Sequence, residues 1–596
     1  NLGWAVHAQA VADINPLGVA AYRSRGLRAF HLPLGFHPLL GGGSHLSQND
    51  REYDITFLGS MTPRRERFFA EHAPFFSERR CHLRLVPLGF AKTKETRSYL
   101  SITARNQVLT QSKILLNVHY SDQKYFEWHR MLVGIANGCC IITEKCLGYG
   151  PLIPGRHFVM VDSEDLIPCC EYFLAHPEEC AAIANSAATF IQTELRQAQL
   201  CRSFLEEFEA DLATSTRDGE RDVEAIAHDS ADPNPEPLPR ELTRQLSAGS
   251  FRHFGTALRE DLRNLWSEVS PRRTRERPLV TQDGSPVELR EAVLEKRRGY
   301  RERWQTQEQA AAEGLPIFQL HENRAAAAAR VPHLSIMVTL YNYARYIGDC
   351  VASIERAAER LDDAVEIVIV NDASTDQSLR EALRSATASR LPVRIADKKW
   401  NTGLADARNK GVQLARGDYV FIMDADNLIF PNALKQLLDV FKTGSFAAAY
   451  SLLCRFRGTP GNRVGLLSHF DWDPQILVQH PYIDAMAMFR RDALLELSGY
   501  DNQLSQIGWF GWEDYDLWLR FALKDYSVGF VPNVLCLYRH HDTSMINTTN
   551  LFSTELVGHF MANYGELLDR FDPSATIFGV PRESVRDLEK RNSRLV

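Results

Sequence analysis

The chain has 596 residues, of which 44% are hydrophobic and 24% charged, and its formal net charge is −7 at pH 7. This length exceeds what one hydrophobic core organises, so we expect two to four domains. The composition is that of an ordinary globular protein, and the mildly acidic charge argues against a broad surface for nucleic acid or membrane.

No apolar run of about 18 residues is present, so the sequence has no evident transmembrane span, and no signal peptide is recognisable. The chain begins at Asn1 rather than Met, so an upstream segment could be missing. The eleven cysteines are odd in number and form no C-x-x-C pair. Reduced, buried thiols therefore fit better than a disulfide framework or a zinc site. We expect a cytoplasmic protein, or one peripheral to the inner face of the membrane.

Residues 1–212 alternate between segments typical of strands and of helices. Apolar segments predict five strands, at 29–35, 54–60, 82–89, 113–118 and 139–143, and a helix at 130–136 precedes the last of them. Strands that alternate with helices predict a parallel, doubly wound α/β sheet.

This first region resembles the C-terminal, nucleotide-binding half of GT-B glycosyltransferases. The residues that carry the resemblance are Leu32–Phe36, Thr56–Ser60, Phe126–Arg130 with Ala136–Cys139, and the segment from Gly155 to Leu166. Retaining members have two glutamates eight residues apart, whereas Glu127 has Ile135 at that offset. The resemblance implies a Rossmann-like half-domain that lacks the other half of its cleft. A scaffold or docking role is therefore favoured, with nucleotide or sugar binding as the alternative.

Residues 213–330 are predicted to be a flexible linker followed by a helical connector. The stretch 218–240 is rich in Asp, Glu, Pro and Arg and poor in large apolar residues, which is typical of a linker. From 242 to 329 helix formers dominate, and alternating charges near 290–298 favour exposed helices.

The clearest pattern begins at Leu334. Apolar segments predict strands at 334–340, 365–370, 393–395 and 420–423, with helices at 347–360 and 404–416 between them. Polar residues follow three of these strands directly. Because the carboxyl ends of parallel strands meet at one edge of a sheet, we expect those side chains to gather there. The next segment, 451–480, reads as irregular and is expected to cover the acceptor side.

Two carboxylates, Asp424 and Asp426, end the short apolar strand at 420–423. An unpaired carboxylate beside a core is costly, whereas a hard divalent cation takes oxygen ligands and itself holds phosphate oxygens. The pattern predicts a site for a metal ion and a diphosphate. The structural alternative is an Asx-type turn with solvated acids.

From about 333 to 548 the sequence resembles glycosyltransferase family 2, which has the GT-A fold with a mixed, mostly parallel sheet. The family usually has Asp-Asp-Gly-Ser where this chain has Asn371–Ser374, which keeps the second acid. The resemblance implies a catalytic domain over 331–550, with a helical tail at 551–596. The residues that it implies for binding the nucleotide sugar are Thr339, Tyr341, Asp372, Arg408 and Asp424. Those that it implies for the metal, Mn²⁺ or Mg²⁺, are Asp424, Asp426 and His541.

Glu513 and Asp514 follow a stretch rich in Gly and Trp at the start of a predicted helix. Acids in a first turn complement the helix dipole, which is the structural alternative. Inverting sugar transfer needs a base for the attacking hydroxyl, and the family has that base at this pair. The resemblance therefore implies that Asp514 is the base and that Glu513 contacts sugar hydroxyls. Trp509 and Trp512 would either face a sugar ring or lie in the core.

The function that these resemblances imply is inverting, metal-dependent hexosyl transfer from a nucleotide diphosphate sugar, with a UDP-sugar favoured. The acceptor would be a hydroxyl of a glycan or lipid-linked saccharide in cell-surface polysaccharide biosynthesis. Peripheral association with a membrane-bound assembly complex is an expected partnership, and nucleic acid is not an expected partner. The alternatives are a non-catalytic subunit or scaffold of such a complex and, less favoured, a nucleotidyltransferase.

Overall fold

The computed structural model describes residues 8, 10–14, 16–41, 46–86, 100–121, 125–214, 286–327, 331–503, 512–541, 553–571, 576–578 and 580–581. The chain forms two compact units. The N-terminal unit comprises Asn1–Arg65, Arg79–Gly89 and Leu100–Asn264, and the C-terminal unit comprises Glu66–Glu78, Phe90–Tyr99 and Leu265–Val596. The linker predicted from residue 213 lies, from 215 to 285, outside the described residues.

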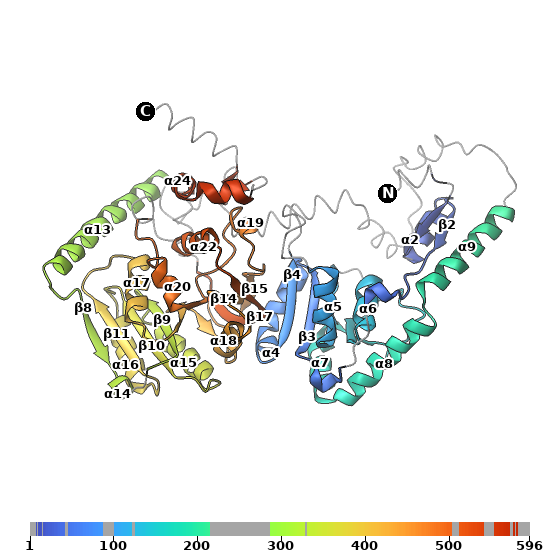
Figure 1. Cartoon of the computed structure of the whole chain (residues 1–596), viewed down its shortest axis with the longest axis horizontal. Helices are drawn as coiled ribbons and strands as arrows, with labels where there is room; N and C mark the ends of the chain where they lie inside the picture. The colour runs from blue at the N-terminus through green and yellow to red at the C-terminus, as the bar shows by residue number, and fades with distance from the viewer. Residues whose placement is uncertain are drawn as a thin grey trace, which may run out of the picture. The chain divides into compact units, whose positions relative to one another are not determined.

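The N-terminal unit is built on a five-stranded, wholly parallel sheet in the order β4-β3-β5-β6-β7 (Figure 1). Its strands are β3 Tyr53–Ser60, β4 Cys81–Val86, β5 Ser112–Asn117, β6 Cys140–Glu144 and β7 Val159–Val161. Its main helices are α5 Ile102–Thr110, α6 Trp128–Ala136, α7 Leu166–Ala175, α8 Pro177–Thr193 and α9 Gln197–Thr214. The predicted alternation of strands and helices is confirmed. The exception is the strand expected at 29–35, because β2 (Ala29–His31) pairs with β1 (Val11–Asp13) in a separate sheet.

The C-terminal unit contains a ten-stranded mixed sheet in the order β13-β17-β14-β16-β12-β9-β10-β11-β8, with β15 paired to β14. Its strands are β8 Phe318–Glu322, β9 Leu334–Leu340, β10 Val365–Asn371, β11 Val393–Lys398, β12 Tyr419–Asp424, β13 Leu428–Ile429, β14 Ala448–Phe456, β15 Arg463–Leu467, β16 Met488–Arg490 and β17 Val528–Arg539. Strands β9 to β12 are parallel, whereas β8 and β16 run antiparallel to their neighbours in this group. The predicted mixed, mostly parallel α/β fold is confirmed.

Helices cover both faces of this sheet, as parallel strands require crossover connections. The principal helices are α13 Pro286–Ala312, α15 Ile347–Ala358, α16 Ser378–Ala388, α17 Leu404–Leu414, α18 Ala433–Thr443, α22 Glu513–Leu523 and α24 Ser553–Phe571. Every residue of β9 and β10 is buried, which explains why both read as continuous apolar runs. None of the described helices combines the length and apolar character that a membrane crossing needs.

The alternation of side chains along β12 sorts them between two cores. Val420 and Ile422 belong to the core shared with α22 and α24, whereas Phe421 and Met423 belong to the core shared with α15 and α18. Asp424 continues the side of Val420 and Ile422. The strand therefore directs its terminal carboxylate toward α17 and α22 rather than toward α15.

Two segments differ from the sequence-based expectation. The segment expected to be irregular after residue 450 contains most of β14, all nine residues of which are buried, and a hairpin to β15. The segment expected to be a helical connector ends in β8, which pairs antiparallel with β11. In both places pairing with a strand distant in sequence decides the conformation, which local composition does not report.

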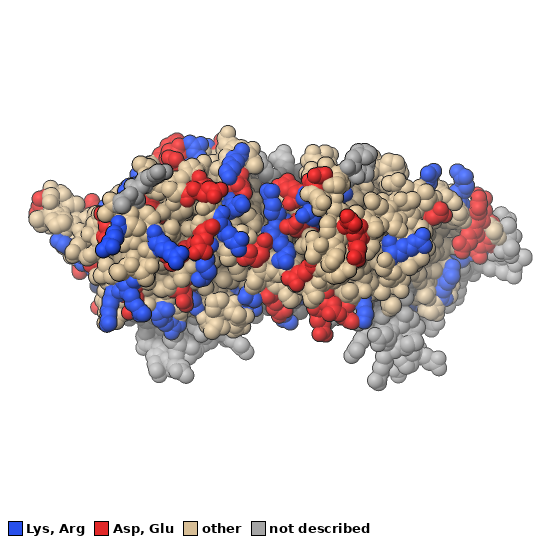
Figure 2. Space-filling model, turned by 90° about the horizontal axis from the view of Figure 1, so that it is seen from below, with Lys and Arg blue, Asp and Glu red and all other residues tan. Residues whose placement is uncertain are grey.

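Acidic and basic side chains are interspersed on the face of the molecule that Figure 2 shows. That face carries no broad field of one sign.

A buried ion cluster ties the amino-terminal ends of β9 to β12 together. The fully buried carboxylate of Glu366 accepts hydrogen bonds from Ser335 Oγ at 2.7 Å, Arg394 Nη2 at 3.0 Å and Arg416 Nε at 3.0 Å. A buried carboxylate is tolerated only when it is paired and hydrogen-bonded, so each partner supports the others.

We expect Arg394→Met to lower the free energy of unfolding by about 3 kcal/mol or more, because the buried Glu366 loses its buried guanidinium partner and keeps only Arg416, whose side chain is 37% exposed. Chemical denaturation followed by tryptophan fluorescence measures this change. The matched control is Arg384→Met, since that side chain is 82% exposed and pairs with Glu381 on the surface; its effect is expected to stay below about 1 kcal/mol. Equal effects of the two substitutions would contradict a structural role for the cluster.

Candidate active site

Three parallel strands of the C-terminal unit end side by side and deliver polar side chains to one edge of the sheet. They are β9 with Thr339, β10 with Asp372 and β12 with Asp424. Thr339 and Asp424 are register partners, and the threonine hydroxyl donates a hydrogen bond of 2.5 Å to Asp424 Oδ1. The convergence expected from the sequence is therefore present in the structure.

The guanidinium of Arg408 on α17 lies at the centre of this edge and is 2% exposed. Its Nη2 lies 3.2 Å from both carboxylate oxygens of Asp424, and its Nη1 lies 2.6 Å from Glu513 Oε1. Burial alone lowers the pKa of Arg408, but Asp424 and Glu513 raise it above its usual value, so the group stays charged. Arg408 thus joins the end of β12 to the start of α22.

The close approach of α17 to the sheet places Arg408 at this depth. A Cβ at Gly411 would lie 2.2 Å from Met337 Cγ on β9, so a larger residue would push the helix outward. Glycine at this position is consistent with the contact that Arg408 makes with Asp424.

Asp514 lies in the first turn of α22, next to the buried Glu513, and is itself half-buried. Burial and the neighbouring Glu513 carboxylate raise the pKa of Asp514 to about 8, although Arg408 opposes the shift. A carboxyl group with this pKa can exchange a proton near neutral pH. Trp512, which precedes the helix, lies in the core and stacks on Phe560 at 5.8 Å, whereas Trp509 lies outside the described residues.

The structure adds Asp484 to this group, a residue that the sequence did not single out. Burial, together with the charges of Asp424 and Asp426, raises its pKa to about 6. Asp484 also raises the pKa of Asp514. Its position between β15 and β16 carries no local signal in the sequence.

Asp426 is buried and its Oδ2 lies 2.8 Å from His541 Nε2. Burial raises the pKa of Asp426, against the hydrogen bond to the imidazole. Arg539 donates from Nε to the carbonyl oxygen of Asp426 at 2.9 Å and lies over the ring of Tyr346. Arg539 thus fastens the end of β17 to the turn that carries Asp426.

Two of the three predicted metal ligands, Asp426 and His541, contact each other, whereas the third, Asp424, has other partners. Asp424 faces Arg408 and Thr339, whereas Asp426 faces His541. Within the described ranges, the ligand atoms of the three do not all lie within 4.8 Å of one another. The donor chemistry nevertheless fits a divalent cation, since the acids of this edge outnumber its buried cations Arg408, Lys398 and Arg539, and several of these acids have raised pKa values.

A tighter group of metal-binding residue types, Asp501, Asp516 and His559, lies elsewhere in the same unit. Asp516 in this group already accepts hydrogen bonds from Arg520 Nε at 2.9 Å and from the Tyr564 hydroxyl. These bonds account for the buried carboxylate as part of an ion pair.

Asp372, predicted to contact the nucleotide, is buried and fully engaged with the loop after β11. Its Oδ1 accepts from Lys398 Nζ at 2.6 Å and from the Thr402 amide at 3.2 Å, and its Oδ2 accepts from the Gly403 amide at 3.0 Å. Tyr341, the other predicted contact beyond β9, is 41% exposed. Tyr341 is therefore accessible at the surface, whereas Asp372 lies beneath the loop that follows β11.

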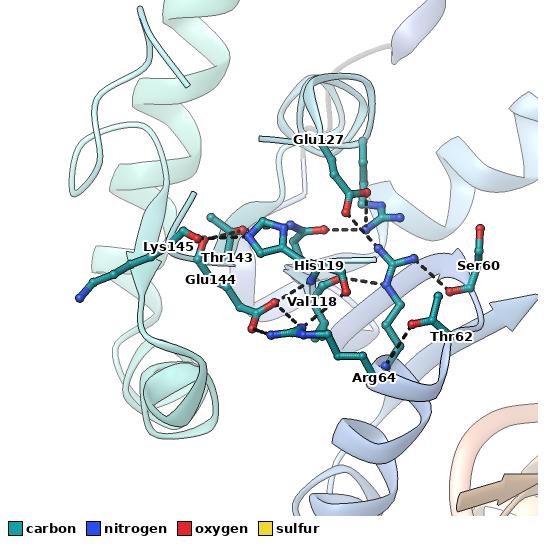
Figure 3. Close-up of polar contacts among 12 residues, drawn as sticks. Ser60, Thr62, Arg64, Val118, His119, Glu127, Thr143, Glu144 and Lys145 are labelled. Atoms are coloured by element: carbon teal, nitrogen blue, oxygen red, sulfur yellow. Dashed lines mark hydrogen bonds and ion pairs between the residues drawn. The ribbon is translucent and has the colours of Figure 1, made fainter. Parts of the chain in front are cut away.

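In the N-terminal unit, a separate polar network lies at the carboxyl ends of β3, β5 and β6 (Figure 3). Arg64 pairs with Glu144 at 2.5 Å, while Arg65 and Arg130 both pair with Glu127, at 3.0 and 2.9 Å. A pocket of about 410 Å³ lies beside Glu127 and Arg130. Each of these guanidinium groups has a carboxylate partner inside the unit.

Two family models match the chain. Residues 335–497 match the model described as Glycosyl transferase family 2, and residues 62–208 match the model described as Glycosyl transferase-like. Both resemblances seen in the sequence are confirmed over these ranges. The first match includes Thr339, Asp372, Arg408 and Asp424 but ends before α22.

Several known proteins are similar to part of this chain. The chain is 29% identical over 215 residues to the chondroitin synthase of Escherichia coli, a match that covers 35% of this chain and 29% of that protein. It is 36% identical over 138 residues to the hyaluronan synthase of Pasteurella multocida, covering 23% and 13%. It is 25% identical over 210 residues to the amylovoran biosynthesis glycosyltransferase AmsE of Erwinia amylovora, covering 34% and 75%. The chain thus spans less than a third of the first two relatives.

Solved structures give weaker likenesses. The TarS 1–349 fragment of S. aureus in complex with UDP is 17% identical, with a TM-score of 0.30 and coverage of 40% of this chain and 70% of that one. The mannosyltransferase PcManGT of Pyrobaculum calidifontis, in complex with GDP-Man and Mn²⁺, is 18% identical, with a TM-score of 0.32 and coverage of 48% and 79%. Likenesses at this level carry no argument about function.

We expect Arg408→Met to destabilise the protein more at pH 8 than at pH 5. Arg408 lowers the pKa values of Asp484 and Asp514, so without the guanidinium these raised values move further above their unfolded value of about 4. A carboxyl with a raised folded pKa retains its stability below the unfolded pKa and loses it as the pH rises through the folded pKa.

Denaturant unfolding of Arg408→Met and wild type at the two pH values measures the effect. The loss is expected to reach about 3 kcal/mol at pH 8 and to shrink at pH 5. Arg384→Met again serves as the exposed control. A pH-independent loss would mean that Arg408 contributes packing rather than charge compensation.

Proposed function

We propose that the C-terminal unit transfers a sugar from a nucleotide diphosphate sugar to a hydroxyl group with inversion of configuration. The observation that carries this proposal is the ion pairing of the buried Arg408 with Asp424 and with Glu513, directly beside Asp514, whose pKa is raised to about 8. Such perturbed acids at the end of a parallel sheet are typical of a catalytic site. A UDP-sugar is the favoured donor.

In the proposed reaction Asp514 is the general base. It accepts the proton of the acceptor hydroxyl as that oxygen attacks the anomeric carbon, from the face opposite the diphosphate. The attack forms the new glycosidic bond and breaks the bond to the diphosphate oxygen, so a single displacement inverts the centre. Glu513, held by Arg408, orients sugar hydroxyls beside the base.

The donor would lie at the ends of β9, β10 and β12. In this proposal Tyr341 stacks on the base, Thr339 and Asp424 contact the ribose region, and Asp372 contacts the base or ribose through the loop that it holds. The exposed ring of Tyr341 supports the first of these roles. Arg408 acts by holding Asp424 in place.

A divalent cation, Mn²⁺ or Mg²⁺, would be held by Asp424, Asp426 and His541. When bound, it would stabilise negative charge on the departing diphosphate. The raised pKa of Asp426 supports this assignment, since a buried carboxyl without a full counter-charge favours a cation. An imidazole ligand favours Mn²⁺ over Mg²⁺.

For the whole protein we propose a role in cell-surface polysaccharide biosynthesis, with a glycan or lipid-linked acceptor and a location at the inner face of the membrane. The names of the relatives support the product class. The N-terminal unit is proposed to be a scaffold, because its strand-end arginines are already paired with Glu127 and Glu144.

The test of the function is nucleoside diphosphate release across a panel of nucleotide sugars, with and without Mn²⁺. We expect release together with a glycosylated product, and we expect Asp514→Asn to lower turnover by about 10³-fold while UDP binding stays unchanged. The control is Asp492→Asn, an exposed acid at the surface. Near-normal turnover of Asp514→Asn would show that the base is a different group. Release of pyrophosphate would indicate a nucleotidyltransferase, and no release would favour a non-catalytic subunit.

The metal assignment has its own prediction. Mn²⁺ is expected to tighten UDP binding to the wild type. Asp426→Asn preserves the shape of the side chain and is expected to weaken UDP binding in the presence of Mn²⁺ by about tenfold. Calorimetric titration of UDP with MnCl₂ or with EDTA measures both. The surface variant Asp439→Asn is the control and should bind like wild type. Equal Mn²⁺ dependence in the Asp426 variant would remove this residue from the metal site.

A further inference from the structure

Helix α13 lies outside the family match yet bonds directly to its interior. The match begins at residue 335, whereas α13 spans Pro286–Ala312 and belongs to the C-terminal unit (Figure 1). Arg303 Nε donates to the Asn401 carbonyl at 2.7 Å, and Gln307 Nε2 donates to Asp406 Oδ2 at 3.1 Å. The helix is therefore hydrogen-bonded to both ends of the segment 401–406.

This segment is the one that holds Asp372. The amides of Thr402 and Gly403 donate to the Asp372 carboxylate, and Lys398 Nζ bridges Asp372 at 2.6 Å to Asp406 at 2.7 Å. Gly403 has a φ of +100°, a conformation that favours glycine and aims its amide at the acid. A shift of the segment would move the hydrogen-bond donors away from Asp372.

The same segment leads directly into α17, which carries Arg408. Asp406 and Arg408 lie in the first turns of that helix, and Arg408 contacts Asp424 and Glu513. Through this loop α13 supports the acid proposed to contact the nucleotide, whereas Arg408 is held in place by its own ion pairs with Asp424 and Glu513.

Three buried polar atoms between α13 and this loop have no hydrogen-bond partner among the described residues. They are Asn401 Oδ1, Gln307 Oε1 and Trp304 Nε1. Buried polar atoms without partners are uncommon in folded proteins and mark places where a further group completes the network. Tyr300, one turn earlier, packs under Arg303 at 4.4 Å, and burial together with the nearby charge of Asp372 raises the pKa of its hydroxyl.

We propose that α13 is part of the donor-nucleotide site. In this proposal Arg303 and Gln307 are positioning residues that hold the segment 401–406 against Asp372. The inference rests on the proposed function, because it assigns this edge to the nucleoside of the donor. Arg303 and Gln307 set the affinity for the nucleotide and leave the chemistry at Asp514 unchanged.

The test uses the full chain and UDP as the probe, in calorimetric titrations with MnCl₂, together with donor KM and kcat. Arg303→Ala is expected to weaken UDP binding and raise the donor KM by about tenfold, while kcat at saturating donor changes less than about twofold. Arg303→Lys, which can still donate to the Asn401 carbonyl, is expected to restore most of the affinity. Arg301→Ala, an exposed arginine on the same helix, is the matched control and should bind like wild type.

Gln307→Met, which keeps the volume and removes the hydrogen bond to Asp406, provides an independent variant if Arg303→Ala does not fold; it should weaken UDP binding in the same direction. A lower melting temperature with unchanged UDP affinity and KM in both variants would overturn the proposal and leave α13 a purely structural helix. A fall in kcat with unchanged KM would overturn it as well. If wild type bound no nucleotide and released no diphosphate, the proposed function itself would fail, and the role of α13 with it.

Discussion

The buried guanidinium of Arg408 is the interaction on which the candidate site depends. It joins Asp424 at the end of β12 to Glu513 at the start of α22, two residues that no local contact brings together. A charge removed from water costs several kcal/mol unless its partners stay in place. Three elements are therefore held in one relative position, and with them the neighbouring Asp514.

Around Arg408 the carboxyl groups of the C-terminal unit outnumber the basic side chains that could balance their charge. Asp426, Asp484 and Asp514 all have raised pKa values, each chiefly because of burial. In the N-terminal unit, by contrast, the arginines at the strand ends are paired with Glu127 and Glu144. Two α/β units with related layouts thus differ in charge balance, and it is the uncompensated one for which we propose a bound cation and a proton transfer.

The elements that form the candidate site extend beyond the segment that matches the family model. Strand β8 completes one side of the sheet beside β11, and α13 holds the loop that carries the amides to Asp372. On the other side, α22 carries Glu513 and Asp514, and His541 follows β17, all beyond the end of the match. The edge of the sheet is therefore assembled from both flanks of the family segment.

The sequence by itself determined the main strands and helices, because a strand buried on both faces, such as β9, β10 or β12, is an apolar run that local composition reveals. It also pointed to Asp424, Arg408 and Glu513, which the structure brings into contact. Only the tertiary structure decided that Ser451 and Arg455 lie inside a strand, that Asp484 joins the acids, and that Asp372 is held by Lys398. The reason is physical: hydrophobic periodicity is a local property, whereas charge compensation is settled between residues as far apart as Arg408 and Glu513, which are separated by 105 positions.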